Sequence, residues 1–221
     1  MALTYKGRIS KEFTLPDFGD AYDKKLMPAE YMVVLAPHED LYNKIMELKQ
    51  EFATAYENTM AVALKPHISI VRFIQYEMNE LKIHNKLKLL ATALPAFKVD
   101  LDDFGSYPSH TIYIKVQTQE PIKAIAKKLK EAQPLMTINK ENKPHFLNEP
   151  HIAIARKLLP WQYEKGWLEY SNKHFHASFM ADQLLFMKRP AGSKAWQTID
   201  RLKMMNLPVE TKQGDLFTSI F

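Results

Sequence analysis

Two histidines, His67 and His151, occupy the same position in two octapeptides that align without gaps. The segments are Pro66–Phe73 (PHISIVRF) and Pro150–Lys157 (PHIAIARK), and five of their eight residues are identical. An imidazole titrates near neutral pH, so two of them can work together as general base and general acid. A neutral ring can take a proton from water or a ribose hydroxyl, and a protonated ring can give one to a leaving oxygen. The repeat therefore indicates acid–base chemistry on a phosphodiester if the rings meet.

Each motif is expected to begin a strand, in which side chains alternate between two faces. His67 and Ser69 then share one face, whereas Ile68 and Ile70 share the other and can pack on a helix. A hydroxyl two residues after the histidine can donate to a phosphate oxygen as charge develops on it. In the second copy this position is Ala153, which has no hydroxyl.

Each motif also carries an arginine five residues after its histidine, Arg72 in the first and Arg156 in the second. On a regular strand this odd spacing places the arginine on the face opposite the histidine. The arginines therefore reach a shared phosphate only if the strand bulges or ends nearby. Otherwise we expect them to extend into water as cations at the end of a strand.

The tripeptides HIS (67–69) and HIA (151–153) each follow a proline, and each is expected to lie in a strand. They resemble the paired His-x-Ser/Thr signatures of the 2H phosphoesterases. The LigT-like branch is the most similar: it comprises RNA 2′,3′-cyclic phosphodiesterases, also called 2′-5′ RNA ligases. The arginine five residues after the histidine is also similar to that branch. The resemblance extends over roughly residues 30–205, through the order of elements and the spacing of the motifs.

This resemblance implies an α+β, bilobal fold of two duplicated halves, each with a mixed or antiparallel sheet and flanking helices, around a central cleft. It implies a metal-independent phosphoesterase that opens, or in reverse closes, a 2′,3′-cyclic phosphate or 2′-5′ linkage of RNA or a nucleotide. No cofactor is implied. By position, His67 and His151 would be the acid–base pair, Ser69 would hold a phosphate oxygen, and Arg156 and Arg72 would bind phosphate.

Ala153 departs from the family pattern, which has a hydroxyl at this position. Loss of one such donor lowers a rate by about 10²–10³-fold. Three outcomes stay open: another donor replaces the hydroxyl, the activity is slower, or the protein is a binding module for RNA or nucleotides that hardly turns them over. A structural duplicate without any ligand is a further interpretation.

The elements that must position the motifs alternate between helical and strand patterns. The sequence predicts strands over residues 31–36, 63–74, 97–104, 110–118, 151–158, 175–188 and 195–205, and helices over 39–58, 77–94, 121–133 and 160–173. Hairpin-like pairs favour mixed or antiparallel sheets over a doubly wound parallel sheet. Residues 134–150 are expected to be irregular, and so is an N-terminal leader over 1–28. Residues 29–221 are predicted to form a single bilobal domain with motifs at 67–69 and 151–153.

The composition excludes several classes of site. The 221 residues include no cysteine, so disulfides, thiolate nucleophiles and iron–sulfur clusters are excluded. The six glycines form no phosphate-binding loop of the P-loop or Rossmann type. No secretory signal and no apolar run of membrane-spanning length occurs, so we predict a cytoplasmic protein without membrane contact. The net charge of +5 is compatible with a polyanionic partner and equally with a lysine-rich solvated surface. The oligomeric state is not indicated.

Other candidate residues have weaker support. His174 and His176 share a strand face and have the chemistry of metal ligands, but no third ligand is spaced to support them, so we predict no metal site. Four aromatic residues have rings that can stack on a base, although strand positions favour the core: Phe73, Tyr107, Tyr113 and Trp196.

Overall fold

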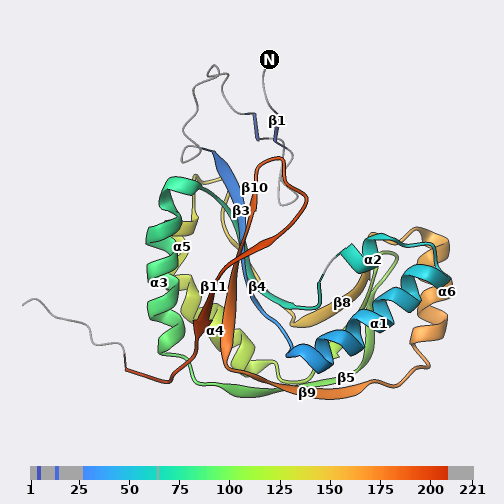
Figure 1. Ribbon diagram of the computed structural model, residues 1–221. Helices are drawn as coiled ribbons and strands as arrows, with labels where there is room; N and C mark the ends of the chain where they lie inside the picture. Colours follow the sequence, from blue (N-terminus) through green and yellow to red (C-terminus); the bar gives the residue numbers. More distant parts are fainter. Residues whose placement is uncertain (1–3, 6–12, 15–26, 64, 209–221) are drawn as a thin grey trace, which may run out of the picture.

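Two antiparallel sheets, each flanked by helices, make up most of the part of the chain that the structure describes (Figure 1). This computed structural model describes residues 4–5, 13–14, 27–63 and 65–208. The predicted α+β class and the antiparallel sheets are confirmed. Most of the predicted leader, residues 1–28, lies outside the described residues, but Pro28 already begins a strand.

The first sheet has the order β11-β10-β3-β4-β7 and the second the order β8-β6-β5-β9. The strands of the first sheet are β3 (Pro28–Leu35), β4 (Ile68–Tyr76), β7 (His145–Phe146), β10 (Gln183–Pro190) and β11 (Gln197–Lys203). Those of the second are β5 (Phe97–Tyr107), β6 (Thr111–Val116), β8 (His151–Arg156) and β9 (His176–Ala181). A separate short pair is formed by β1 (Thr4–Tyr5) and β2 (Phe13–Thr14).

The helices lie between these strands in the sequence. They are α1 (Glu39–Ala55), α2 (Met60–Ala63), α3 (Glu80–Thr92), α4 (Glu120–Leu129), α5 (Gln133–Met136) and α6 (Pro160–Tyr170), with 3₁₀ turns η2 (Glu77–Asn79) and η3 (Lys130–Ala132). Helix α1 illustrates why these segments are helical. Its buried residues recur every three to four positions, as a helix with one apolar side requires.

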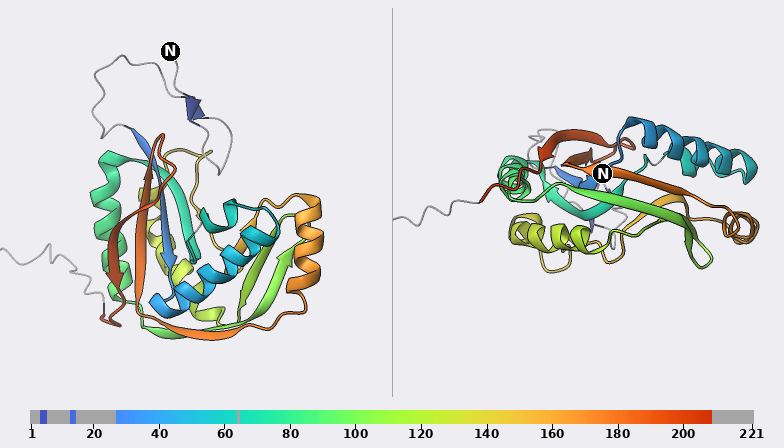
Figure 2. Two further views of the ribbon diagram at one scale, coloured as in Figure 1. Left: turned by 45° about the vertical axis from the view of Figure 1, so that its right-hand side comes forward. Right: turned by 90° about the horizontal axis from the view of Figure 1, so that it is seen from below.

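The duplication appears as two strand–helix–strand units, β3-α1-β4 and β6-α4-β8, whose helices are exchanged between the sheets. Helix α1 connects two strands of the first sheet but packs on β8 of the second. Helix α4 connects two strands of the second sheet but packs on β4 of the first. Figure 2 shows α1 (blue) beside α6 (orange) on one side of the molecule and α4 (yellow-green) beside α3 (green) on the other. The exchange ties each motif strand to a helix from the other unit.

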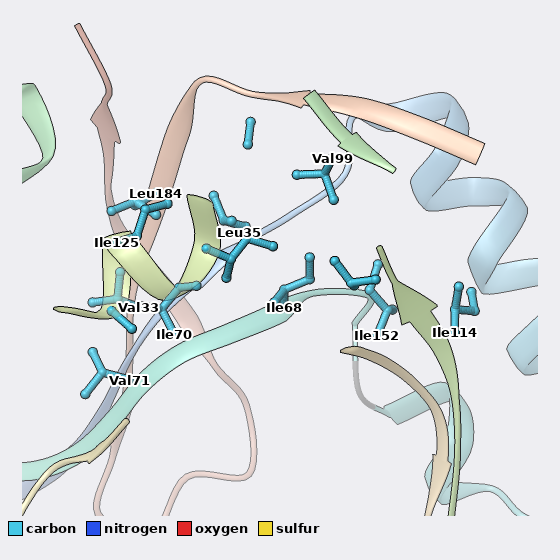
Figure 3. Packing of buried hydrophobic residues seen from close by; sticks show 14 of the residues in the cluster. Val33, Leu35, Ile68, Ile70, Val71, Val99, Ile114, Ile125, Ile152 and Leu184 are labelled. Atoms are coloured by element: carbon cyan, nitrogen blue, oxygen red, sulfur yellow. The ribbon is translucent and has the colours of Figure 1, made fainter. Parts of the chain in front are cut away.

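One large apolar core runs through both sheets, and a second, small cluster contains Met32, Val34 and Met187. Ile68 and Ile70 of β4 belong to the same buried cluster as Ile114 of β6 and Ile152 of β8 (Figure 3). Burying apolar surface is worth about 25 cal/mol per Å², so a shared core fixes the placement of one sheet against the other. The first residues of the two motif strands are therefore held together.

Several predicted elements differ from the structure. The strand predicted over 175–188 is two strands in different sheets, since β9 pairs with β5 and β10 pairs with β3. The predicted start of the strand over 63–74 was also wrong, because Met60–Ala63 is helical. The segment 134–150 is less irregular than expected, with a helical turn and the two-residue strand β7. Asp182 and Gln183 are two consecutive polar residues at the crossover, and the buried positions change phase there, from Phe179 and Ala181 to Leu184 and Phe186.

Among the described residues, no helix is long and apolar enough to cross a membrane. The cytoplasmic location stays a prediction.

Candidate active site

The two motif histidines stand at equivalent places in the two sheets. His67 directly precedes β4, and His151 is the first residue of β8. The strands β4 and β8 contact each other. The charge of His151 contributes to lowering the pKa of His67. The two motif strands are therefore in contact, and the charge of one histidine acts on the other.

Both imidazole rings are oriented by the same backbone hydrogen bond. Nδ1 of His67 lies 2.7 Å from the carbonyl oxygen of Lys65, and Nδ1 of His151 lies 2.9 Å from that of Glu149. A carbonyl oxygen can only accept, so in each case Nδ1 carries the hydrogen. In the neutral rings Nε2 is then the basic nitrogen. Both motifs thus present the same nitrogen for proton transfer.

The surroundings keep both rings neutral at physiological pH. His67 is only 7% exposed, and burial, together with the charges of Arg156, Lys49 and His151, lowers its pKa to about 4. Burial and the charge of Arg156 also lower the pKa of His151, although Glu149 opposes the shift. Desolvation disfavours an imidazolium, and neighbouring cations add to the effect.

A β-bulge interrupts both motif strands three residues after the histidine. In β4, Val33 pairs with Val71 but Val34 pairs with Ser69, so Ile70 is the extra residue. In β8, Ile112 pairs with Ala155 but Tyr113 pairs with Ala153. The extra residue there is Ile154.

The bulge changes which residues share a face. One inserted residue shifts the alternation of side chains by one position. Arg72 therefore lies on the same face as Ser69, and Arg156 lies on the same face as Ala153. We call this the motif face of each sheet. From the sequence, the arginines were expected to reach the side of the histidines only if the strand bulges or ends nearby. Both copies have such a bulge.

The carbonyl groups at the two bulges have different donors. Ile70 accepts a hydrogen bond from the backbone N–H of Leu147 at 2.9 Å. In the second motif the ammonium group of Lys49 donates to the carbonyl oxygens of Ala153 and Ile154, at 2.8 and 2.9 Å. Buried carbonyl groups need such partners, so these contacts stabilise the bulges.

Sequence reasoning missed Lys49. This side chain is 1% exposed, although it belongs to α1 and reaches a strand more than a hundred residues away in the sequence. Burial, and to a smaller extent the charge of Arg156, lowers its pKa to about 7. The signal was present: Lys49 follows Ile45 by four residues and falls on the apolar side of the helix.

Arg156 has no hydrogen bond or carboxylate partner among the residues that the structure describes, although it is partly buried. Burial and the charge of Arg72 lower its pKa, and Arg156 in turn lowers the pKa of His67, His151 and Lys49. A partly buried guanidinium among other cations costs free energy unless an anion compensates it. The motif face around Arg156 is therefore suited to bind an anion.

Arg72 is in a different environment from Arg156. Its guanidinium pairs with Glu30, which also binds Arg189 at 2.5 Å. Burial alone would raise the pKa of Glu30, but the hydrogen bonds and charges of the two arginines lower it overall. Trp196 lies over both guanidinium groups, 5.4 and 5.0 Å from its ring centre. A phosphate would have to compete with Glu30 for Arg72.

The hydroxyl positions of the two motifs also differ in structure. Ser69 is half-buried on the motif face of the first sheet, opposite Val34. Ala153 is 4% exposed, opposite Tyr113 of β6. The structure thus leaves one motif hydroxyl, from Ser69, on the motif faces.

Two tyrosines enclose His151. Its ring lies 4.9 Å from that of Tyr113 and 5.4 Å edge-on from that of Tyr107, measured between centroids. The hydroxyl of Tyr107 donates to Glu149 at 3.0 Å. Gly105 makes room for Tyr113, because a Cβ there would lie 2.6 Å from its ring. Of the four aromatic residues considered from the sequence, Phe73 is in the core, whereas these two and Trp196 are near the motif residues.

Residues 37–193 match the family model of the 2′-5′ RNA ligase superfamily, including both motifs. The chain belongs to the 2′-5′ RNA ligase superfamily. A Geobacillus thermodenitrificans protein named "Putative phosphoesterase" is 27% identical over 153 residues, which is 66% of this chain and 80% of that protein. The family assignment made from the two motifs is thereby confirmed.

Solved structures similar to this chain share its fold. The protein TT0787 of Thermus thermophilus superimposes with a TM-score of 0.56 at 12% identity, covering 80% of this chain and 98% of that one. E. coli LigT complexed with 3′-AMP gives a TM-score of 0.52 at 14% identity, with the same coverage. At these identities the likeness establishes the fold alone. The roles of the motif residues stay predictions.

Replacing Lys49 by methionine tests how its buried ammonium group acts on the folded chain. Because its pKa is about 7 when folded and 10.5 ordinarily, the unfolded chain binds one more proton between these pH values. Its contribution to stability therefore rises with pH in this window, by up to about 1.4 kcal/mol per pH unit, and is constant below pH 7. Lys49→Met should lose this rise in unfolding free energy, measured by urea denaturation at several pH values.

Lys44→Met is the matched control, because Lys44 is an exposed residue of the same helix. It should keep the pH dependence of the unaltered chain. An unchanged pH dependence in Lys49→Met would contradict the buried position of the ammonium group.

Proposed function

We propose that this chain is a phosphoesterase that acts on 2′,3′-cyclic phosphate or 2′-5′-linked ends of RNA or nucleotides. One observation carries the proposal: two imidazoles with a basic Nε2 both feel the charge of Arg156, which lacks a carboxylate partner among the described residues. Imidazoles supply proton transfer, and a guanidinium binds a phosphate through two parallel hydrogen bonds. The proposed chemistry uses protein groups and needs no metal ion.

In the hydrolytic direction, one imidazole takes a proton from water while the water oxygen bonds to phosphorus. The bond between phosphorus and one ribose oxygen breaks, and this oxygen takes the proton of the other imidazole. Ring closure or ligation is the same sequence in reverse. Each histidine must therefore change its protonation state once in every turnover.

We assign His67 as the base and His151 as the acid of hydrolysis. His67 is the more buried ring, and three neighbouring cations hold it neutral. His151 is half-buried, and Glu149 favours its protonated form. Two titratable groups whose environments differ in this way commonly divide the roles of acid and base. A bound phosphate would raise the pKa of both rings, because it offsets the charges around them.

Arg156 takes the role of the missing second hydroxyl in this proposal. The bulge at Ile154 places its guanidinium on the face that carries Ala153. It can donate to a non-bridging phosphate oxygen from there, while Ser69 donates from the other sheet. E. coli LigT has been crystallised with 3′-AMP and with ATP, which supports a nucleotide as the ligand of this fold.

Ala153 also favours a second candidate function, a module that binds RNA or nucleotides without turnover. Such a module would keep the anion site around Arg156 and lack effective proton transfer. Incubation with a 2′,3′-cyclic nucleotide separates the two functions. Saturable binding without product would favour the module.

Removing either imidazole tests the enzyme. We expect His67→Ala and His151→Ala each to lower kcat for a 2′,3′-cyclic nucleotide by about 10²–10⁴-fold, because each loses a proton-transfer group. The double variant should have no measurable turnover, and a chelator should leave the unaltered protein as active as before. His38→Ala, which removes an exposed histidine of another region, is the control. Full activity in the double variant would exclude this mechanism.

The pH profile follows from the two lowered pKa values. The active free form has His67 neutral and His151 protonated, so it is most populated above about pH 4 and below the ordinary histidine value of 6.5. We therefore expect the optimum of kcat/KM on the acid side of neutrality, at lower pH than the sequence alone indicated. An optimum above pH 7 would contradict this assignment of protonation states.

A pair of variants tests the replacement of the second hydroxyl. Arg156→Ala should lower kcat by about 10²–10³-fold, as loss of a transition-state donor does. Ala153→Ser should change kcat by less than about tenfold, because the guanidinium already serves the phosphate oxygen. If Ala153→Ser increases kcat more than tenfold instead, the site is a weakened member of the family whose second donor is absent.

A further inference from the structure

A cluster of two imidazoles and two carboxylates lies away from the motif histidines, where β5 meets the beginning of β9. Ligand atoms of Asp103, His174 and His176 all lie within 4.8 Å of one another. Nδ1 of His174 is 3.3 Å from a carboxylate oxygen of Asp103. The two imidazole planes are nearly parallel, at 10°. Asp103 is the third ligand that sequence spacing did not reveal, because it is 71 residues from His174.

We propose that Asp103, His174 and His176 form a binding site for a divalent transition metal ion of the zinc class. Two imidazole nitrogens with one carboxylate oxygen suit Zn²⁺, Co²⁺, Ni²⁺ or Cu²⁺, whereas Mg²⁺ and Ca²⁺ prefer oxygen ligands. Around Zn²⁺ the ligand atoms lie about 2.0–2.2 Å from the ion, hence roughly 3.4 Å from one another. The His174–Asp103 distance already matches, so small side-chain rotations complete the triad.

The backbone holds Asp103 in place for this role. Its φ of +56° is in the left-handed region, which few residues other than glycine adopt. The register of β5 against β6 breaks between Leu101 and Phe104, so Asp103 projects from an irregular point of the strand. Its backbone N–H donates to Phe175 at 2.7 Å, and its carboxylate accepts the N–H of Phe175 at 3.1 Å. Asp103 is thereby joined to the residue that lies between the two histidines.

Asp102 provides the outer partner of a metal-binding imidazole. Its carboxylate lies 2.5 Å from Nδ1 of His176, and its other oxygen accepts a hydrogen bond from Gln117 at 3.2 Å. A carboxylate that holds one ring nitrogen fixes the tautomer and leaves the other nitrogen, here Nε2, to coordinate the ion. Register places Asp102 directly opposite His176 across β5 and β9.

The site is accessible to ions from solution. The side chains of His174 and His176 are 80% and 69% exposed. A surface pocket of about 520 Å³ beside them is lined by Asp100, Asp102, Gln117, His176 and Ser178, among others. Three protein ligands leave one tetrahedral position for water or an anion from this side. The cluster is separate from the motif residues, because β9 and β8 are opposite edges of the second sheet.

Zinc binding to the full chain tests this proposal directly. After chelator treatment and its removal, ZnCl₂ is titrated by calorimetry, and CoCl₂ is added to record the visible spectrum of the bound ion. We expect one ion per chain. His174→Ala and His176→Ala should each weaken binding at least about tenfold, because loss of even an outer partner costs about 10–100-fold in affinity. MgCl₂ should not compete.

Two controls make the result specific. His38→Ala removes an exposed histidine elsewhere, and His151→Ala removes a motif imidazole, so both should bind zinc as the unaltered chain does. The proposal is overturned if the cluster variants bind like the unaltered chain, or if His151→Ala abolishes binding instead. The proposal is also overturned if zinc shows no saturable binding with a Kd below about 1 mM. Because these outcomes need no turnover, they are independent of the proposed phosphoesterase activity.

Discussion

The feature on which the rest of the site depends is a β-bulge three residues after each motif histidine. Without the extra residue, an arginine five positions from its histidine would project to the opposite face. With Ile70 and Ile154 inserted, the arginines join Ser69 and Ala153 on the motif faces. The carbonyl groups at the bulges have a different donor in each copy: a backbone N–H in the first, Lys49 in the second. The duplication therefore preserves the geometry and not the contacts that support it.

The exchange of helices explains why two sheets can share one site. Helix α1 belongs to the first strand–helix–strand unit but supplies Lys49 to the motif strand of the second. A common apolar core holds both motif strands, so their histidines do not depend on a flexible hinge between independent lobes. The cost of this arrangement is a group of positive charges in partly buried surroundings. Lowered pKa values of His67, His151 and Lys49 reduce that cost, and a bound phosphate would reduce it further.

Much of this arrangement follows from the sequence, because the repeat is local and its strand alternation is simple. The family, the α+β class and the antiparallel sheets were predicted correctly from the two octapeptides and the order of elements. The bulges were stated only as a condition, since no residue type marks them. Lys49 was missed because lysine side chains are usually exposed, even in a helix with an apolar side. Its partners, the carbonyl groups of Ala153 and Ile154, are also far away in the sequence. Asp103 was missed for the same reason: the partner of His174 is brought to it by strand pairing and not by spacing.

In the proposed mechanism, the rings of His67 and His151 serve one phosphate group. NMR titration of the two imidazoles, assigned through His67→Ala and His151→Ala, measures this directly in the presence and absence of a nucleoside 3′-monophosphate. Without ligand, His67 should titrate near pH 4 and His151 below 6.5; one equivalent of ligand should raise both pKa values together. A shift of one ring alone, or of neither, would contradict the claim.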